Sequence, residues 1–420
     1  MAPEHSGALP RVVITGIGPV TPIGTGVAAF GASLREGRSG VAPIRSFDAS
    51  DLKVRIAAEV SDFAPERYMS AKAAKRMARF SQFAVAASHL ALADAGLDRA
   101  GLDPDRVGVV VNTGGGGVNT ILEEQELAAR RGVGRASALF VPTMAPNMAA
   151  CQVSIELGLR GPVIASVAAC ASSVTAFIDG AHLIQRGEAE LVLAGGAEAS
   201  ISPLGVSALA NMHALSRRND EPARASRPFD KDRDGFVIGE GAAVCVLETL
   251  AAARARDARI YAEVLGGGRC ADAYHISAPD PEGEGAARAM ARALQAAQRP
   301  PTAVDYVCAH GTGTVLNDAA ETNAIKQVFG EHAYRLAVSS PKSLTGHLMG
   351  AAGAVSVTAT ALALERQFLP PTINLDTPDP DCDLDYVACR SREAAVRVAF
   401  ANGFGFGGQN AVVALARVDG

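Results

Sequence analysis

The chain has 420 residues, 48% of them hydrophobic, which is enough to bury one large core or two medium ones. Its formal net charge of -5 argues against a nucleic-acid-binding protein, because such proteins gain affinity by neutralising phosphates with basic residues. The seven cysteines form no CxxC pair, and the cysteines and histidines lack the ligand spacing of a zinc site. Residues 1–10 hold no hydrophobic run and no stretch is long enough to span a bilayer, so we expect a cytoplasmic protein with reduced cysteines and no membrane segment.

The first predicted element is a strand at residues 11–18 that runs into a glycine turn. The letters GIGPVTPIG superficially match a dinucleotide-binding fingerprint. However, Thr21 stands at the third glycine position and no helical pattern follows at once, so nucleotide binding is not favoured.

A long helix is predicted from Ser70 to Gly96, with Ser70 as its N-cap and Gly96 as its C-terminal stop. The spacing i, i+3, i+4 and i+7 places four basic residues on one face: Lys72, Lys75, Arg76 and Arg79. A solvated helix face is the simplest interpretation of this basic stripe.

A buried strand is predicted at residues 106–111, and it ends in a run of four glycines at 114–117. Glycines after a strand can cradle a phosphate, but no GK[ST] follows here. Close backbone packing beside a pocket is therefore the favoured interpretation.

Cys170 lies where a predicted strand turns into a predicted helix. The apolar run at 163–167 indicates the strand, and the spacing of apolar residues over 174–181 indicates the helix. Unpaired amides and the positive end of the helix dipole favour a thiolate at such a position, so we expect a lowered thiol pKa and a nucleophile. The alternative is a small buried hydrophobic residue.

The pattern of elements restarts near residue 260. Before this point, further strands are predicted at 190–196 and 242–247. After it, strands are predicted at 260–264, 304–309, 336–339 and 411–417. Helices are predicted at 285–298 and from Glu321. The loop at 227–241 is dense in charge and glycine and is expected to be ordered. We therefore predict two similar α/β halves, residues 1–258 and 259–420, each a mixed sheet covered by helices.

Two histidines follow strands of the second half. His310 enters a glycine-rich turn in VCAHGTGT, and AVSSPKSLTGHLMGAAG places Lys342 in a turn and His347 at the start of a small-residue helix. Either histidine alone is more often structural. Ligands bind beyond strand ends in open α/β sheets, so Cys170, His310 and His347 at three such ends together predict a catalytic site.

Four motifs in this order resemble the β-ketoacyl-acyl carrier protein synthases of the thiolase fold, in particular synthase II: VAACASS, HGTGT, KSLTGH and GFGFGGQN. The likeness runs essentially from end to end. It implies a duplicated α-β-α-β-α fold, a homodimer, and condensation of an acyl group with malonyl-acyl carrier protein. It also implies no cofactor of the enzyme's own, because the phosphopantetheine arm belongs to the carrier protein, and no metal.

The resemblance assigns a role to each matching residue. Cys170 would carry the acyl group, His310 and His347 would donate hydrogen bonds to the malonyl thioester, and the amides of Cys170 and Phe406 would form an oxyanion hole. Lys342 would pair with Glu321. The substrate-binding set is Thr312, Thr314, Gly115, Phe140, Phe404 and Ser277. The acidic carrier protein would dock on Lys72, Lys75 and Arg76.

Three features depart from synthase II. Ala168 stands in place of a threonine, Gly115 stands in place of an isoleucine that closes the acyl pocket, and VLNDAAET from Val315 is closer to polyketide ketosynthases. A longer or bulkier acyl group is therefore expected to fit. The alternative is a ketosynthase of a type II polyketide system, paired with a chain-length-factor subunit.

Other classes fit the residues less well. A thiolase needs a second cysteine in GFGFGGQN, and synthase III or chalcone synthase relatives have asparagine where His347 stands. A non-catalytic chain-length partner lacks the nucleophile that Cys170 supplies. A cysteine hydrolase would leave His347 and Lys342 unexplained.

Overall fold

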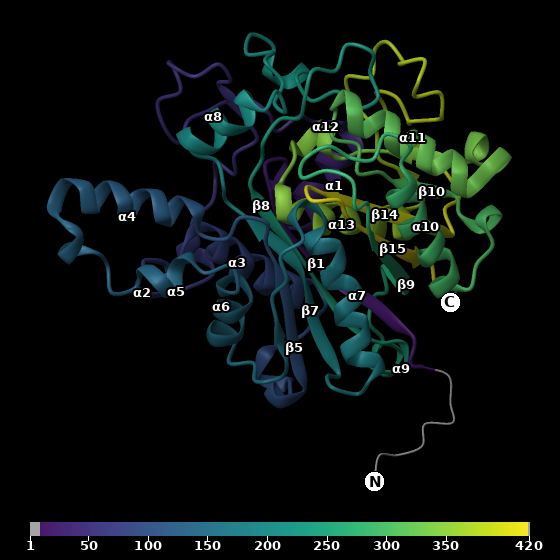
Figure 1. Cartoon of the computed structure of the whole chain (residues 1–420). Coiled ribbons are helices and arrows are strands. Elements are labelled where there is room, and N and C mark those ends of the chain that lie inside the picture. Colours follow the sequence, from purple (N-terminus) through teal and green to yellow (C-terminus); the bar gives the residue numbers. More distant parts are fainter. Residues whose placement is uncertain (1–8, 419–420) are drawn as a thin grey trace.

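The computed structural model describes residues 9–418 (Figure 1). Most of the N-terminal segment in which no targeting signal was predicted therefore lies outside the described residues. Between residues 9 and 418, no helix is both long enough and apolar enough to cross a membrane.

The two halves of the central sheet share one topology. The first half orders its strands β6-β5-β7-β8-β1, and the second orders them β11-β10-β14-β15-β9. In each half the first three strands run parallel to one another. Each of the other two pairs antiparallel with the strand before it in this order. The strand bounds are β1 Val12–Thr21, β5 Val107–Asn112, β6 Val163–Ile164, β7 Leu191–Glu198, β8 Gly241–Thr249, β9 Ala262–Ala271, β10 Tyr306–Cys308, β11 Ala337–Ser339, β14 Val398–Gly405 and β15 Gln409–Ala416.

The duplication inferred from the order of elements is thus visible as repeated strand order. Residues 12–14 of β1 pair with 262–264 of β9, so the two mixed sheets are joined edge to edge. The predicted division at residue 258 falls between α9 (Leu250–Ala255) and β9.

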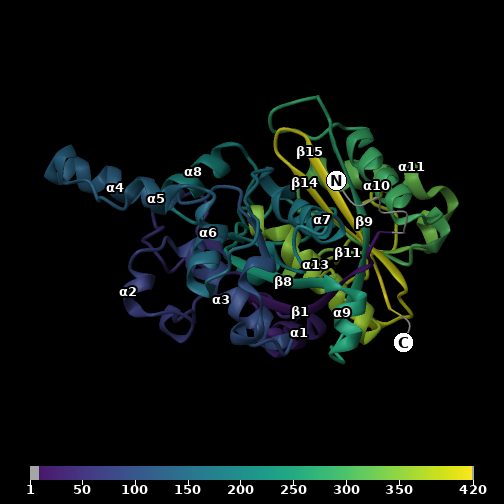
Figure 2. The same ribbon diagram turned by 90° about the horizontal axis from the view of Figure 1, so that it is seen from below.

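Helices form three layers around the sheet (Figures 1 and 2). The inner layer holds α7 (Ser172–Gln185) and α13 (Ala352–Arg366), which contact strands of both halves. Residues 352–364 of α13 are all buried, as expected for a helix of small and apolar residues between two sheets. The outer helices are α3 (Arg79–Asp94) and α6 (Met148–Leu157) on the first half, and α10 (Glu284–Ala297) and α11 (Val315–Phe329) on the second.

Glycines allow α3 to lie directly on β1. A Cβ atom at Gly18 would lie 2.0 Å from the carbonyl oxygen of Ala87. Because an alanine-rich helix face meets a glycine-bearing strand, the backbones approach more closely than larger side chains permit.

The predicted single helix over residues 70–96 is wrong, because the chain forms two helices, α2 (Ala71–Ala74) and α3. The Ser70 side chain does cap α2 by accepting the Ala73 N–H, and Gly96 follows α3 in a left-handed conformation. The break coincides with Arg79, which binds both oxygens of Glu240 at 2.7 and 2.9 Å. The periodicity of the helix sequence cannot predict an ion pair with a residue so distant in the chain.

One helix boundary and one strand also differ from prediction. Helix α11 begins at Val315, six residues before Glu321, because the Thr314 hydroxyl accepts the Asn317 N–H as an N-cap. Strand β14 was not predicted, since its glycines mask the alternation of side chains that indicates a strand.

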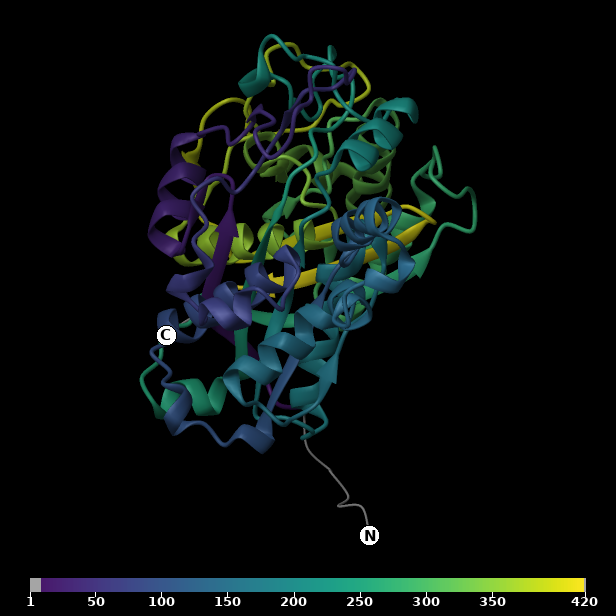
Figure 3. The same ribbon diagram turned by 90° about the vertical axis from the view of Figure 1, so that its left-hand side faces the viewer.

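An arm extends away from the layered body (Figures 1 and 2), and Figure 3 views the molecule from the side that carries it. It consists of α4 (Val118–Arg131) and α5 (Phe140–Met144), and α8 (Pro203–Asn211) lies on the same side of the body. No residue of α4 is buried. The remaining short elements are β2 Gly24–Thr25, α1 Val27–Glu36, β3 Ala42–Pro43, β4 Ile56–Ala57, α12 Lys342–Thr345, β12 Phe368–Leu369 and β13 Arg392–Glu393.

Candidate active site

Cys170 lies in a short 3-10 turn directly before α7, which confirms its predicted place between a strand and a helix. The preceding Ala169 has a φ of +47°, a left-handed conformation that is uncommon for a residue with a Cβ. The thiol is buried, and the backbone amides of Cys170 and Phe406 lie close enough to the sulfur to favour its thiolate form.

The predicted lowering of the thiol pKa is wrong for this site. Burial raises the pKa of Cys170 to about 12, although the charge of Lys342 and the two amides act in the opposite direction. A buried sulfur loses its hydration, and a few dipoles do not replace it. The nucleophile therefore rests as a thiol, and its proton must leave as the sulfur attacks.

His347 is in direct contact with the nucleophile. Its Nε2 lies 3.1 Å from Cys170 Sγ, and its Nδ1 accepts the Met349 N–H at 3.2 Å. A backbone N–H can only donate, so the proton of the neutral ring is on Nε2. Burial and the charge of Lys342 lower the pKa of His347 well below its usual value, which keeps this donor neutral.

His310 completes the predicted triad. The rings of His310 and His347 meet edge to face with centroids 5.4 Å apart. One nitrogen of each ring and Cys170 Sγ all lie within 4.8 Å of one another, so the three residues converge as predicted. Burial, Lys342 and His347 lower the pKa of His310 well below its usual value.

The same three atoms have the composition of a metal-binding set. A metal requires a thiolate, whereas burial raises the pKa of Cys170. The absence of a metal or a cofactor remains a prediction.

Lys342 and Glu321 do not form the predicted direct ion pair. Lys342 Nζ donates to the His310 carbonyl at 2.5 Å, while the Glu321 carboxylate accepts the amides of His310 and Gly311 at 2.8 and 2.7 Å. Asn402 also donates to Glu321, at 3.0 Å. The cation and the anion therefore fix the backbone of His310 from two sides.

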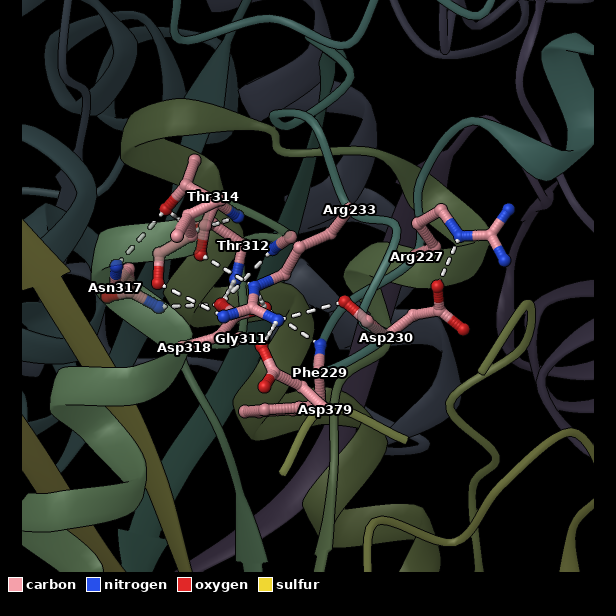
Figure 4. Close-up of polar contacts among 12 residues, drawn as sticks. Arg227, Phe229, Asp230, Arg233, Gly311, Thr312, Thr314, Asn317, Asp318 and Asp379 are labelled. Atoms are coloured by element: carbon pink, nitrogen blue, oxygen red, sulfur yellow. Dashed lines mark hydrogen bonds and ion pairs between the residues drawn. The ribbon is translucent and has the colours of Figure 1, made fainter. Parts of the chain in front are cut away.

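A second network holds the turn that follows His310 (Figure 4). Asp318 accepts the amides of Thr312 and Gly313 at 3.0 and 3.2 Å. The buried Arg233 lies 3.6 Å from the Asp318 carboxylate and donates to the Thr314 carbonyl at 3.2 Å. Neither Arg233 nor Asp318 was predicted as a site residue, although the charged, glycine-rich stretch at 227–241 was a signal for an ordered loop.

Two cavities meet near Cys170. The first, of about 290 Å³, reaches the triad and has five further predicted site residues in its wall: Ser277, Thr312, Thr314, Phe404 and Phe406. The second, of about 380 Å³, is lined mainly by apolar residues and includes Gly115. Met349 and Phe406 line both cavities, so they separate one from the other. Phe140 lines neither cavity and lies half-buried on the arm.

The glycines at 114–117 pack closely beside a pocket, as predicted. The amides of Gly114 and Gly115 donate to the buried carboxylate of Glu198. Glu198 was not predicted as a functional residue, because nothing in its local sequence distinguishes it from a surface glutamate.

The predicted docking residues Lys72, Lys75 and Arg76 are all exposed on and after α2. Arg79, the fourth member of the basic stripe, is occupied by its ion pair with Glu240. Arg79 is still 42% exposed, but its charge is offset by Glu240, so it adds less positive charge to this surface than the helical spacing predicts.

The chain matches two family models in succession. Residues 10–253 match the N-terminal domain of beta-ketoacyl synthases, and residues 261–376 match the C-terminal domain. Among curated relatives, the 3-oxoacyl-[acyl-carrier-protein] synthase 2 of Synechocystis sp. is 48% identical over 405 residues, covering 96% of this chain and 97% of the relative.

Solved structures agree with this grouping. The ishigamide ketosynthase/chain length factor matches with a TM-score of 0.93 and 38% identity, over 98% of this chain and 100% of that one. A type II polyketide synthase acyl-carrier protein in complex with its ketosynthase bound to the hexaketide gives a TM-score of 0.89 and 33% identity, with the same coverage.

Proposed function

The chain belongs to the β-ketoacyl synthase family and is a ketosynthase of the synthase II type, and we propose that Cys170, His310 and His347 carry its reaction. The product is a β-ketoacyl-acyl carrier protein, formed with release of CO2. One observation supports the residue assignment above all: a thiol and two neutral imidazoles converge within 4.8 Å at the inner end of a cavity.

In the first step, Cys170 takes the acyl group from a carrier-protein thioester. The bond from Cys170 Sγ to the acyl carbon forms, the bond to the carrier sulfur breaks, and the thiol proton ends on the carrier's phosphopantetheine. The amides of Cys170 and Phe406, which lie beside Sγ, would bind the oxyanion of the tetrahedral intermediate.

In the second step, malonyl-carrier protein enters the first cavity and its carboxylate leaves as CO2. The electron pair of the broken bond moves to the thioester, where the Nε2–H of His347 and a donor of His310 stabilise the enolate. Donors of this kind contribute about 3 kcal/mol each to the transition state. The enolate carbon then bonds to the acyl carbon, and the sulfur of Cys170 leaves and regains a proton.

The second cavity is the proposed site for the acyl chain. It lies beyond Met349 and Phe406, and its wall is mainly apolar. A Cβ at Gly115 would have Glu198 Oε1 at 3.2 Å and Ser200 and Val118 only at 3.9 Å, so larger residues there would extend into open cavity. This space favours a long or bulky acyl group over the shortest ones.

A secondary-metabolite system is the second candidate for the pathway. One structure reported above is titled as part of a type II polyketide synthase and the other as a ketosynthase/chain length factor, while the curated relative is a synthase 2. A library of acyl-carrier proteins with short, long and polyene chains decides between the two. Preference for saturated long chains supports fatty acid synthesis, and preference for polyenes or polyketides supports the alternative.

We also propose that an acyl carrier protein docks on Lys72, Lys75 and Arg76. These cations are exposed and would attract an acidic surface. The hydroxyls of Thr312 and Thr314 lie 2.9 Å apart in the wall of the first cavity, where they can hydrogen-bond the polar pantetheine arm. Because the carrier protein brings the phosphopantetheine arm, the enzyme needs no cofactor of its own.

We further propose that the enzyme works as a dimer, either with a second copy or with a chain-length-factor-like subunit. Strand β6 is an edge strand whose segment exposes Val163 and Val167, and Ile155 beside it is 64% exposed. An apolar edge of this kind is normally covered. Light scattering on the purified chain, alone and with its partner candidates, distinguishes the two forms.

A cytoplasmic location is proposed as well, since all seven cysteines are free.

Mass spectrometry tests the whole scheme. The enzyme is mixed with acyl-carrier protein and then with malonyl-carrier protein, with a chelator present in one arm. The expected products are acyl-Cys170, CO2 and a β-ketoacyl-carrier protein, with equal yield in the chelator arm. Acylation at any other residue, or hydrolysis of the thioester without a new carbon-carbon bond, would overturn the assignment.

A further inference from the structure

Glu198 is a buried carboxylate without a part in the reaction steps above. It ends β7, is fully buried, and accepts hydrogen bonds from backbone amides of two loops. Its Oε2 accepts Gly114 N–H at 2.8 Å, Gly115 N–H at 3.2 Å and Gly350 N–H at 3.1 Å. The first two glycines follow β5, and the third follows His347 in the other half of the chain.

The two loops touch through their backbones. A Cβ at Gly350 would lie 2.0 Å from the amide nitrogen of Gly114 and 2.9 Å from Glu198 Oε2. A Cβ atom does not fit there, and the Glu198 carboxylate accepts all three amides where the two backbones meet. A shift of the carboxylate therefore moves both loops.

The Gly350 contact leads directly to His347. Gly350 follows Met349, which has a φ of +46°, and the Met349 N–H is the donor to His347 Nδ1. A non-glycine residue keeps a left-handed conformation only when its surroundings hold it there. The hydrogen bond that the next amide in the chain, Gly350 N–H, donates to Glu198 supplies such a restraint.

The Gly115 contact leads to the acyl cavity. Gly115 lines that cavity, and Met349 lies in the wall between it and the cavity that reaches the triad. One carboxylate thus connects the acyl-cavity wall, the dividing residue and the turn that orients a catalytic imidazole.

We propose that Glu198 is a positioning residue for the condensation, which holds the Met349–Gly350 turn against the Gly114–Gly115 loop and thereby keeps His347 as the Nε2–H tautomer. This inference rests on the proposed role of His347 as a hydrogen-bond donor to the malonyl thioester. It predicts that loss of Glu198 impairs malonyl decarboxylation more than acylation of Cys170, because acylation uses the amides of Cys170 and Phe406.

The test compares Glu198→Gln with Glu248→Gln. Glu248 is a matched control, since it is also buried but binds Thr15 and Arg256 on the far end of β8. A glutamine has one acceptor oxygen and no charge, and with that oxygen at the Oε2 position its NH2 group faces the Gly115 N–H that Oε1 accepts at 3.3 Å, so two donors oppose each other. We expect Glu198→Gln to lower the rate of malonyl decarboxylation roughly 10- to 100-fold, as for a displaced catalytic group, and to change acylation less than about threefold. Glu248→Gln should leave both rates near those of the wild type.

A spectroscopic readout separates positioning from general damage. The ¹⁵N spectrum of histidine-labelled enzyme, assigned with His347→Asn, should show wild-type His347 as the Nε2–H tautomer and Glu198→Gln as a mixture. An unchanged tautomer in Glu198→Gln, or equal losses of acylation and decarboxylation, would overturn the proposal.

Two provisions keep the outcome decisive. If Glu198→Gln does not fold, Glu198→Asp replaces it, because the shorter carboxylate cannot reach all three amides and should shift the same signal. An Nδ1–H tautomer in the wild type overturns the proposal without any Glu198 variant. The spectrum needs no turnover, so a wild type that shows the Nε2–H tautomer but does not condense would refute the proposed function alone.

Discussion

The loops after β5 and β10 occupy equivalent places in the two halves, and they differ in what surrounds their carboxylates. After β5, Glu198 accepts the amides of Gly114 and Gly115, and the loop forms a wall of the acyl cavity. After β10, Glu321 accepts the amides of His310 and Gly311. Each half thus stabilises a glycine-containing loop with one buried carboxylate that receives successive N–H groups.

The second loop has cations that the first does not use. Lys342 binds the His310 carbonyl, and Arg233 lies beside Asp318 behind the same turn. Burial and the charge of Lys342 lower the pKa of both histidines, and the same charge opposes the effect of burial on the pKa of Cys170. The two halves share one fold, but the loop after β5 lines a cavity, whereas the loop after β10 is surrounded by charged groups.

Removing the nucleophile is the largest change that can be made to the first half. Cys170→Ala should lower condensation by more than about 10³-fold, since no other group near the two histidines can hold the acyl chain. Steady-state formation of β-ketoacyl-carrier protein measures this loss. Wild-type-like turnover would remove the mechanism.

Removing either imidazole changes the second half. His310→Ala and His347→Ala should each lower malonyl decarboxylation about 10²- to 10³-fold, because each deletes a donor to the enolate. Acylation of Cys170 should suffer less, as shown by mass spectrometry of the acyl-enzyme. If acylation fails first, the division of roles between the halves is wrong.

The pH dependence of Cys170 tests the balance between burial and nearby charge. The thiol pKa of about 12 means that the thiolate fraction grows throughout the range from pH 7 to 10. Alkylation by iodoacetamide should therefore rise about tenfold per pH unit without a plateau, provided that the same species reacts throughout. A plateau near pH 8 would show that amides and Lys342 outweigh burial. Cys170→Ala gives the background rate.

Reversing surface charge should have the smallest effect. The double variant Lys72→Glu with Lys75→Glu should raise KM for carrier-linked substrates about tenfold at low salt and leave kcat within about twofold, because steering acts mainly on encounter. A matched pair, Arg130→Glu with Arg131→Glu at the end of α4, controls for net charge. An unaltered KM would count against α2 as the docking site.

Several parts of this molecule follow from local sequence. The Ser70 cap, the left-handed Gly96 and the strand-to-helix junction at Cys170 depend on residues within one turn of each other, so pattern alone predicts them. The convergence of Cys170, His310 and His347 followed from the rule that parallel strand ends meet at one edge, together with the resemblance of four motifs.

Other properties depend on neighbours far apart in the chain, and only the tertiary structure decided them. The chain breaks between α2 and α3, and Arg79, the first residue of α3, is bound by Glu240, which is far away in sequence. Glu198 became a bridge between two loops because folding removed it from water and surrounded it with amides. Burial raised the pKa of Cys170 against the local helix dipole, since desolvation depends on every atom packed around the sulfur. Sequence by itself predicted which groups would perform the chemistry, and tertiary packing determined their protonation and the groups that surround them.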